Sequence, residues 1–337
     1  MSDREAAFAG GPLTWEIIAI DPGSGRTTDL TNSPTDELFP SASPDGQHVL
    51  YVLSPSTPFG EAVPMVMTKT GTGAIGMPFT CPTQFSCTGV SNGGVTNDES
   101  AGDDVGAAWL ADGEVRFLVH GDSPASGGTT PSDVLMFNVP SETASGYTAS
   151  YDIVTSLANR ASREPTTDLE AYTRGAGLYT YRISTGQETQ LAPACTFPTT
   201  CVTAPVWSVD GNTLYVIRQG AIWAYATNGS SGRELYSAAA LSTLVASPDG
   251  KWVAFVDNES LKVLSLNGGA ATPTLLFPTS ATPNMEVTGA VAWSPDSKSL
   301  AFVAGGIGFS IWGVNVDGSA LKEIVPATSV FGISWGP

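Results

Sequence analysis

The densest group of side chains that could do chemistry is an acidic run between residues 97 and 104. Asp98, Glu99, Asp103 and Asp104 place four carboxylates within seven residues. Carboxylate oxygens are the hard ligands that Ca²⁺ prefers. The run is therefore a candidate calcium site, and Ca²⁺ is the one cofactor that the sequence suggests. The alternative is a solvated acidic loop without a bound ion.

Four cysteines form two pairs with the same C-x5-C spacing, Cys81 with Cys87 and Cys195 with Cys201. Each pair encloses a proline-containing loop that precedes a tryptophan-containing strand. The matching positions favour two local disulfides, with free thiols or a metal site as the alternative. Two histidines and the lack of a CxxC motif argue against zinc. Disulfides need an oxidising compartment, so we expect a periplasmic or secreted protein; no signal peptide is visible in the sequence as given.

Two segments match a catalytic or cofactor motif in sequence but lack the structural context that the motif requires. Residues 71–76 read GxGxxG, but Met77 and Pro78 follow where a dinucleotide site needs a helix. Residues 332–336 read GxSxG without the following helix or the His and acid partners of a nucleophile elbow. No triad or phosphate cradle is evident, which favours a protein that is not an enzyme.

The charge balance limits the class of partner. The chain of 337 residues has 14 basic and 32 acidic residues, a net charge of -18. This charge repels phosphate backbones, so we expect no nucleic-acid partner, and cations or basic protein surfaces fit better. No apolar run approaches the roughly 18 residues of a membrane helix, so we expect no membrane span.

The elements that must position these residues are indicated by a repeated turn phrase. Its copies lie between short apolar runs, and most are spaced by about 40 to 50 residues, as in β-propellers. The copies are 43–46, 111–113, 209–211, 247–250 and 294–297, with a sixth divided between 335–337 and Asp3. A repeat divided between the chain ends implies a closed ring. Proline, aspartate and glycine suit a tight turn, so we interpret these aspartates as structural.

We therefore predict an all-β fold, a β-propeller of seven four-stranded blades, with six blades as the alternative. The spacing between Asp112 and Asp210 is about double the others and predicts a degenerate blade there. Residues 330–335 are expected to pair with the N-terminal strands at 6–9 and 16–20, which closes the ring. Trp109, Trp207, Trp293 and Trp335 recur at one repeat position and are interpreted as packing wedges between blades. Because a repeat ring has no internal boundary, residues 1–337 are read as one domain.

Residues 247–256 and 293–303 resemble the WD-like Pro-Asp repeat of TolB-type propellers. The resemblance covers nearly the whole chain as a repeat pattern and is strongest from 204 to 337. It implies the propeller fold. The chain shows no counterpart of the α/β domain that precedes the propeller in TolB.

The longest insertions are 54–62, 77–106 and 121–132, all expected on the face opposite the Pro-Asp turns. Loops on a rigid scaffold commonly carry binding, so Phe59, Glu61, Phe85 and Asp122 are the predicted contact residues. We expect a non-enzymatic extracytoplasmic scaffold, a monomeric propeller within a larger assembly, that recognises a protein or glycan. The alternative is a lyase or hydrolase with carboxylates at the channel mouth. Acid pairs facing each other across the channel would favour the enzyme, and an apolar or aromatic rim would favour the scaffold.

Overall fold

The computed structural model describes the strands of the whole ring and part of its connections. The described residues are 2–5, 14–54, 63–76, 108–109, 113–118, 131–139, 143–150, 162–163, 169–174, 177–182, 184–193, 205–267, 272–278, 282, 284–306, 308–327, 330 and 332–337. Within these ranges the regular secondary structure is entirely β. The expected all-β class is confirmed.

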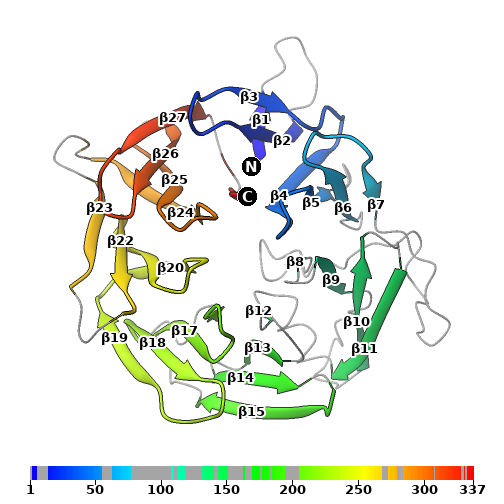
Figure 1. The fold of residues 1–337 in the computed structure, drawn as a ribbon, viewed down its shortest axis with the longest axis vertical. Coiled ribbons are helices and arrows are strands. Elements are labelled where there is room, and N and C mark those ends of the chain that lie inside the picture. Colours follow the sequence, from blue (N-terminus) through cyan, green and yellow to red (C-terminus); the bar gives the residue numbers. More distant parts are fainter. Residues whose placement is uncertain are drawn as a thin grey trace.

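The described strands are hydrogen bonded into seven antiparallel sheets (Figure 1). The first sheet contains β1 (Ser2–Glu5), β2 (Thr14–Ile20) and β3 (Thr27–Asp29). The second contains β4 (Asp36–Ala42), β5 (His48–Ser54), β6 (Val63–Thr68) and β7 (Ile75–Gly76). The third contains β8 (Ala108–Trp109), β9 (Glu114–Leu118), β10 (Pro131–Asn138) and β11 (Thr143–Ser150).

The remaining four sheets each use consecutive strands. The fourth contains β12 (Ser162–Arg163), β13 (Leu169–Arg174), β14 (Gly177–Arg182) and β15 (Gln187–Ala192). The fifth contains β16 (Val206–Trp207), β17 (Thr213–Arg218), β18 (Ala221–Ala226) and β19 (Arg233–Ser237). The sixth contains β20 (Leu241–Ala246), β21 (Trp252–Asp257), β22 (Ser260–Ser265) and β23 (Thr274–Phe277). The seventh contains β24 (Glu286–Trp293), β25 (Ser299–Gly305), β26 (Phe309–Asn315) and β27 (Lys322–Ala327).

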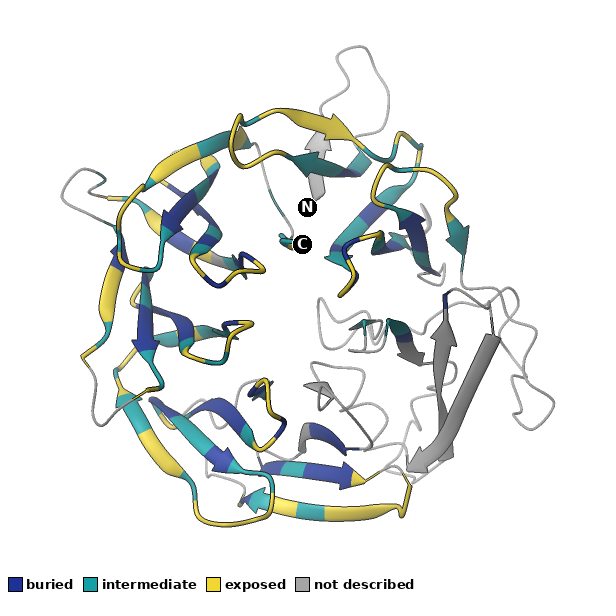
Figure 2. Ribbon diagram, in the orientation of Figure 1, coloured by how far each residue is buried: buried dark blue, intermediate teal, exposed yellow. Residues whose placement is uncertain are grey.

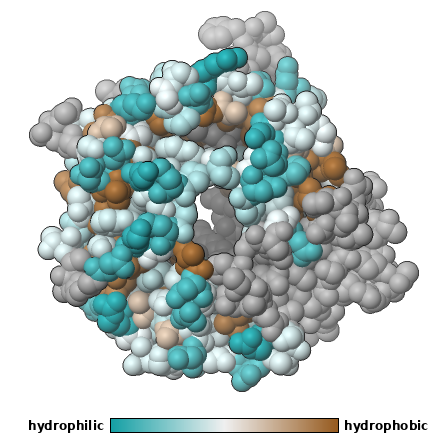
Figure 3. All heavy atoms as spheres, in the orientation of Figure 1, coloured by the Kyte–Doolittle hydropathy of each residue, from teal (hydrophilic) through white to brown (hydrophobic). Residues whose placement is uncertain are grey.

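The sheets stand radially around a central opening, which the space-filling view also shows (Figures 1 and 3). This is a propeller arrangement. The fourth sheet lies in the double interval between Asp112 and Asp210, where a degenerate repeat was expected. Six sheets have four strands and the first has three described strands, so the count of seven four-stranded blades stays a prediction.

The core lies between neighbouring sheets, because the second and third strands of each sheet are apolar on both faces. Val253 and Phe255 of β21 are fully buried and pack with residues of the fifth sheet, whereas Ala254 of the same strand packs with residues of the seventh. The rings of Phe277 and Phe302 meet edge to face, with centroids 5.0 Å apart. Figure 2 shows this buried layer in the middle of the sheets and the exposed residues at the outer strands and turns.

The repeated tryptophans join neighbouring innermost strands. The indole Nε1 of Trp293 in β24 donates to the Val245 carbonyl oxygen of β20, at 3.1 Å. Trp109 in β8 makes the same contact with the Ser41 carbonyl oxygen of β4, at 2.9 Å. Trp293 is buried in the hydrophobic core. For Trp293 the packing role between sheets is confirmed, and Trp109 shares its hydrogen bond to the neighbouring sheet.

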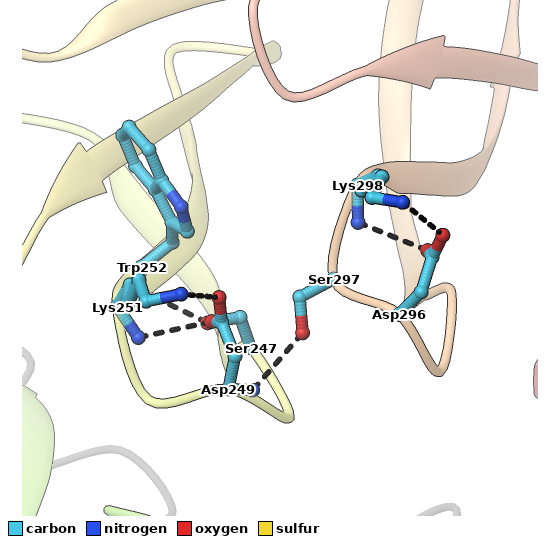
Figure 4. A network of polar contacts seen from close by, with 7 residues as sticks. All are labelled: Ser247, Asp249, Lys251, Trp252, Asp296, Ser297 and Lys298. Atoms are coloured by element: carbon cyan, nitrogen blue, oxygen red, sulfur yellow. Dashed lines mark hydrogen bonds and ion pairs between the residues drawn. The ribbon is translucent and has the colours of Figure 1, made fainter.

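Each described Pro-Asp turn is held by one serine and one aspartate in the same geometry (Figure 4). In the turn between β20 and β21, Ser247 Oγ donates to Asp249 Oδ1 at 2.7 Å and accepts from Trp252 N at 3.0 Å. Asp249 Oδ1 also accepts from Lys251 N at 3.0 Å. The same set of bonds recurs in three other turns, with the pairs Ser43 and Asp45, Ser208 and Asp210, and Ser294 and Asp296.

These bonds stabilise the ionised form of the turn aspartates. Hydrogen bonds from the serine hydroxyls and then from backbone N–H groups lower the pKa of Asp45 and Asp296. For Asp249, burial raises the pKa, but hydrogen bonds from Ser247 and Lys251 outweigh it and the pKa is lowered. A lowered folded-state pKa stabilises the fold above the unfolded-state value, and this contribution is lost as the pH falls. The aspartates act in the turns themselves, as the sequence indicated.

Adjacent turns are also joined to each other. Ser297 occupies the position that glycine holds in the other copies, with φ of 60°, close to the 70° of Gly250. Its hydroxyl oxygen is buried and accepts from Asp249 N at 3.0 Å, so the sixth and seventh sheets are linked at their turns (Figure 4).

Replacing Ser247 by alanine tests the turn geometry. The change leaves the Trp252 N–H without its acceptor and removes one donor from Asp249. We expect a loss of about 1 to 3 kcal/mol in the free energy of unfolding, measured with denaturant. Ser242→Ala, at an exposed serine of the same sheet, is the control and should change stability by less than about 0.5 kcal/mol. Equal losses in the two variants would contradict the role of the serine.

The expected pairing of residues 330–335 with 16–20 is not found among the described residues. Residues 332–337 form no strand, and Asp3, expected in a turn, lies in β1. Ser2–Glu5 pairs with β2 on the edge away from β3, so both edges of β2 are occupied and none is left for the C-terminal segment. The expected partner residues 6–9 lie outside the described part of the chain.

Side-chain and turn contacts join the chain ends to the neighbouring sheets instead. Ser334 Oγ accepts from Ala42 N at 3.0 Å, and Pro337 lies against Gly46 in the turn between β4 and β5. On the other side of the first sheet, Lys322 Nζ donates to the Pro22 carbonyl oxygen at 2.7 Å. We call the junction between the first and second sheets, together with residues 332–337, the seam.

Candidate functional site

The residues predicted to bind calcium or a partner lie outside the described part of the chain. This holds for Asp98, Glu99, Asp103 and Asp104, for Phe59, Glu61, Phe85 and Asp122, and for the four cysteines. The calcium site, the disulfides and the contact residues therefore stay predictions. Within the described ranges, no group of three or more His, Cys, Asp or Glu residues could hold a metal ion.

The strand directions do place the connections that carry these residues. Segment 55–62 joins β5 to β6, 77–107 joins β7 to β8, and 119–130 joins β9 to β10. Because paired strands are antiparallel, the strand ends at Ser54, Gly76 and Leu118 lie on the face opposite the Pro-Asp turns. We call this face the loop face and the other the turn face.

Neither of the two deceptive motifs lies on a helix. Gly71 has φ of 79° in the turn after β6, and Ile75–Gly76 is β7. Residues 332–337 are non-helical to the end. The residues directly after Gly76 lie outside the described part of the chain, so the interpretation that neither motif is a cofactor or nucleophile site stays a prediction.

A buried pair of glutamates lies on the loop-face side of the seam. Glu16, near the start of β2, is 4% exposed, and Glu37, near the start of β4, is 2% exposed. Hydroxyl groups surround both. Thr31 Oγ1 donates to Glu16 Oε2 at 2.8 Å and Thr14 Oγ1 to Oε1 at 3.1 Å. Ser33 and Thr35 donate to Glu37 Oε1.

Burial and the charge of Glu37 shift the pKa values of Glu16 and Tyr51. Burial, together with the charge of Glu37 and a hydrogen bond to its carboxyl group, raises the pKa of Glu16 to about 7, against the lowering effect of the threonine hydroxyls. Burial, and then the charge of Glu37, raises the pKa of Tyr51 to about 12. A carboxyl group with a pKa near neutrality can hold or release a proton under physiological conditions.

The glutamate pair was not singled out from the sequence. A signal existed, because Glu16 interrupts an apolar strand and Glu37 follows a run of hydroxyl residues, Ser33 and Thr35 among them. Strand alternation alone does not show that these residues of two different sheets meet. Their contact depends on the packing of the first sheet against the second.

A second polar cluster lies at the loop-face end of the sixth sheet. Lys262 Nζ contacts Asp257 Oδ2 at 2.6 Å, and the Tyr236 hydroxyl donates to the same oxygen at 3.0 Å. The hydrogen bond to Asp257 raises the pKa of Lys262. This arrangement neutralises a nearly buried aspartate and holds the β21 to β22 connection, which is a structural role.

Comparison with known proteins rests on the fold, because no family model and no curated protein matches the sequence. TolB from Acinetobacter baumannii aligns with a TM-score of 0.54 at 15% identity, over 86% of this chain and 65% of that one. The chain shares the β-propeller fold of this TolB structure. It thus spans 65% of the length of that TolB chain, and identities this low show the fold alone.

Other propellers align equally well. The β-propeller domain of Myceliophteria thermophila Cps50 (Swd1) gives a TM-score of 0.56 at 10% identity, over 89% of this chain and 90% of that one. A chain of the mitotic checkpoint complex gives 0.55 at 16% identity, over 89% and 81%. No helix in the described ranges has the length and hydrophobicity to cross a membrane.

Proposed function

We propose that this chain is a non-enzymatic binding scaffold that recognises a protein or glycan through its loop face. One observation carries the proposal: the ends of the longest connections meet on one face, whereas the opposite face holds short turns fixed by repeated serine and aspartate bonds. A rigid frame with variable connections on one side is the usual design of a binding surface.

The finer features of the proposal come from the sequence. Each of the seven sheets is taken as one blade, and residues 1–337 as one domain. Phe59, Glu61, Phe85 and Asp122 contact the partner, and the propeller works as a monomer within a larger assembly. Two local disulfides, between Cys81 and Cys87 and between Cys195 and Cys201, support a periplasmic or secreted location.

Two comparisons are consistent with a protein partner. The structures that this fold resembles include a propeller domain of Swd1 and a chain of a protein assembly, the mitotic checkpoint complex. The net charge of -18 favours a basic partner surface.

The alternative of a lyase or hydrolase gains no support from the described carboxylates. The acid pair that was found, Glu16 and Glu37, lies between neighbouring sheets and does not face across the channel. Both side chains are almost fully buried, so a substrate could not reach them without movement of the sheets.

Affinity capture from native extract, followed by a binding assay with the captured partner, tests the proposal. Alanine at Phe59, Glu61, Phe85 and Asp122 should weaken binding at least tenfold, since aromatic anchors dominate interface energetics. The matched control replaces exposed turn-face residues, Gln47, Val209 and Lys298, and should leave affinity unchanged. Loss of binding only in the turn-face variant would overturn the choice of face.

A further inference from the structure

The inference concerns the seam and goes beyond the proposed binding function. Glu16 and Glu37 bring two acidic groups into a site that excludes water. No ion pair among the described residues involves either of them. Two uncompensated anions in contact inside a protein are strongly unfavourable, so one charge must be removed or neutralised.

The hydroxyl groups around the pair also accept hydrogen bonds from the backbone. Thr31 Oγ1 accepts from Ile17 N at 2.8 Å and therefore directs its proton to Glu16. Ser33 Oγ accepts from Thr35 N at 3.1 Å and directs its proton to Glu37. These hydroxyls solvate the carboxyl groups as donors, and each accepts one backbone N–H group.

One oxygen of the pair lacks a donor. Glu37 Oε2 is buried and accepts no hydrogen bond from any other group. Glu37 is close enough to Glu16 for its charge and a hydrogen bond to its carboxyl group to raise the pKa of Glu16. A proton on Glu16 would supply the missing donor and remove one of the two charges at the same time.

We propose that Glu16 and Glu37 share one proton, and that the resulting O–H···O bond is a pH-sensitive latch between the first and second sheets. A bound cation is the competing way to neutralise the pair. The hydroxyl donors on Glu16 Oε1, Glu16 Oε2 and Glu37 Oε1 favour the proton, because Glu37 Oε2 is then the one carboxylate oxygen of the pair without a described donor, whereas Ca²⁺ takes about six to eight oxygen ligands.

The other titratable groups around the pair are also acidic. Asp36, next to Glu37, accepts from Trp15 N at 2.8 Å, and Asp29 accepts from Thr31 N at 3.2 Å. Tyr51 of β5 stays neutral, since its pKa is raised to about 12. Negative neighbours favour proton retention on the pair. Among the described side chains packed on the pair none is a cation, and β1, which pairs with β2, places Asp3 opposite Glu16 and Arg4 opposite Trp15 in the strand register.

The sign of the pH dependence follows from the raised pKa of Glu16. Its ordinary value is 4.5 and its value in the fold is about 7. The folded protein therefore binds more protons than the unfolded chain between these limits, and stability falls as the pH rises through this window. The contribution of the latch is complete below about pH 4.5 and lost above about pH 7.

The seam is a place where such a bond has a large effect. On the channel side of the pair, residues of β2, β4 and the C-terminal segment line an apolar cavity of about 290 Å³, which Ile17, Pro40, Ile324 and Trp335 help to form. Empty volume removes packing contacts from a junction, so a single buried hydrogen bond there contributes a larger share of what holds the two sheets together.

Thermal unfolding of the full chain between pH 5 and pH 8.5 tests the latch. Glu16→Gln replaces the shared proton by a permanent amide donor, so its melting temperature should vary less with pH than that of the wild type, whose value should fall by several degrees. Glu286→Gln, at an exposed glutamate of β24, is the matched control and should keep the wild-type slope. An unchanged slope in Glu16→Gln would overturn the proposal.

Two further measurements keep the test decisive. Unfolding the wild type at pH 6 should release up to one more proton than unfolding Glu16→Gln, which calorimetry in buffers of different ionisation enthalpy detects. If CaCl₂ or KCl at pH 8.5 restores the wild-type melting temperature but leaves Glu16→Gln unchanged, a cation holds the pair and the shared proton is wrong.

Discussion

Replacing Trp293 by alanine is expected to cost about 3 to 5 kcal/mol in the free energy of unfolding. The indole is 5% exposed, packs in the core between the sixth and seventh sheets, and donates to the Val245 carbonyl oxygen at 3.1 Å. Its loss creates a cavity and leaves a carbonyl group without its donor. Denaturant unfolding followed by circular dichroism measures the change.

Two companion variants separate the contributions. Trp293→Phe keeps most of the packing and should lose only about 1 to 3 kcal/mol, from the missing hydrogen bond and the smaller ring. Phe309→Ala removes an aromatic ring that is 40% exposed in the same sheet, and should have a far smaller effect than Trp293→Ala. If Trp293→Ala were no worse than Phe309→Ala, the wedge role would be refuted.

Gly46→Ala is expected to be more damaging than the same substitution at Gly113 or Gly250 in the other Pro-Asp turns. Gly46 has φ of 64°, a conformation that costs an L residue about 1 to 2 kcal/mol. A Cβ there would lie 2.6 Å from Pro337 Cγ and 2.7 Å from its carbonyl oxygen, so the C-terminal segment must also move. Forced overpacking of this kind adds about 1 to 3 kcal/mol.

Gly250→Ala is the matched control, because its φ of 70° is similar but the nearest atom to a new Cβ is 3.6 Å away. It should show the conformational cost alone. Chemical denaturation gives the difference between the two variants, and amide exchange of the Ala42 N–H reports on the contact with Ser334. Equal stabilities would mean that Pro337 does not pack on this turn.

The propeller arrangement could be predicted because its signals are local. The hydrogen bonds of each turn phrase join residues only a few positions apart, so five or six consecutive residues are enough to specify the turn. The apolar second strands, such as residues 252–256, follow at a constant distance. The doubled spacing between Asp112 and Asp210 was enough to predict a sheet there, although the repeat itself is weak.

The seam could not be predicted, because it depends on competition between distant segments. The C-terminal residues have a sequence typical of a strand, but Ser2–Glu5 pairs with the edge of β2 at which they were expected to pair. The pairing of Glu16 with Glu37 depends likewise on how two sheets pack. The predicted contact residues lie on connections whose sequences contain few local structural signals. The positions of these connections in the repeat indicate the face on which they begin and end, but not how their side chains are arranged.

The tryptophan contacts have a consequence for how the ring is assembled during synthesis. Trp109 reaches back to β4 and Trp293 reaches back to β20, so in both cases the acceptor belongs to a sheet translated earlier. Each newly synthesised sheet can pack against a sheet that was made before it, so the ring can form sheet by sheet during translation. The first sheet is the exception, because its neighbour through Lys322 is the seventh sheet, which is translated after the other six, so this flank of the first sheet stays uncovered until then.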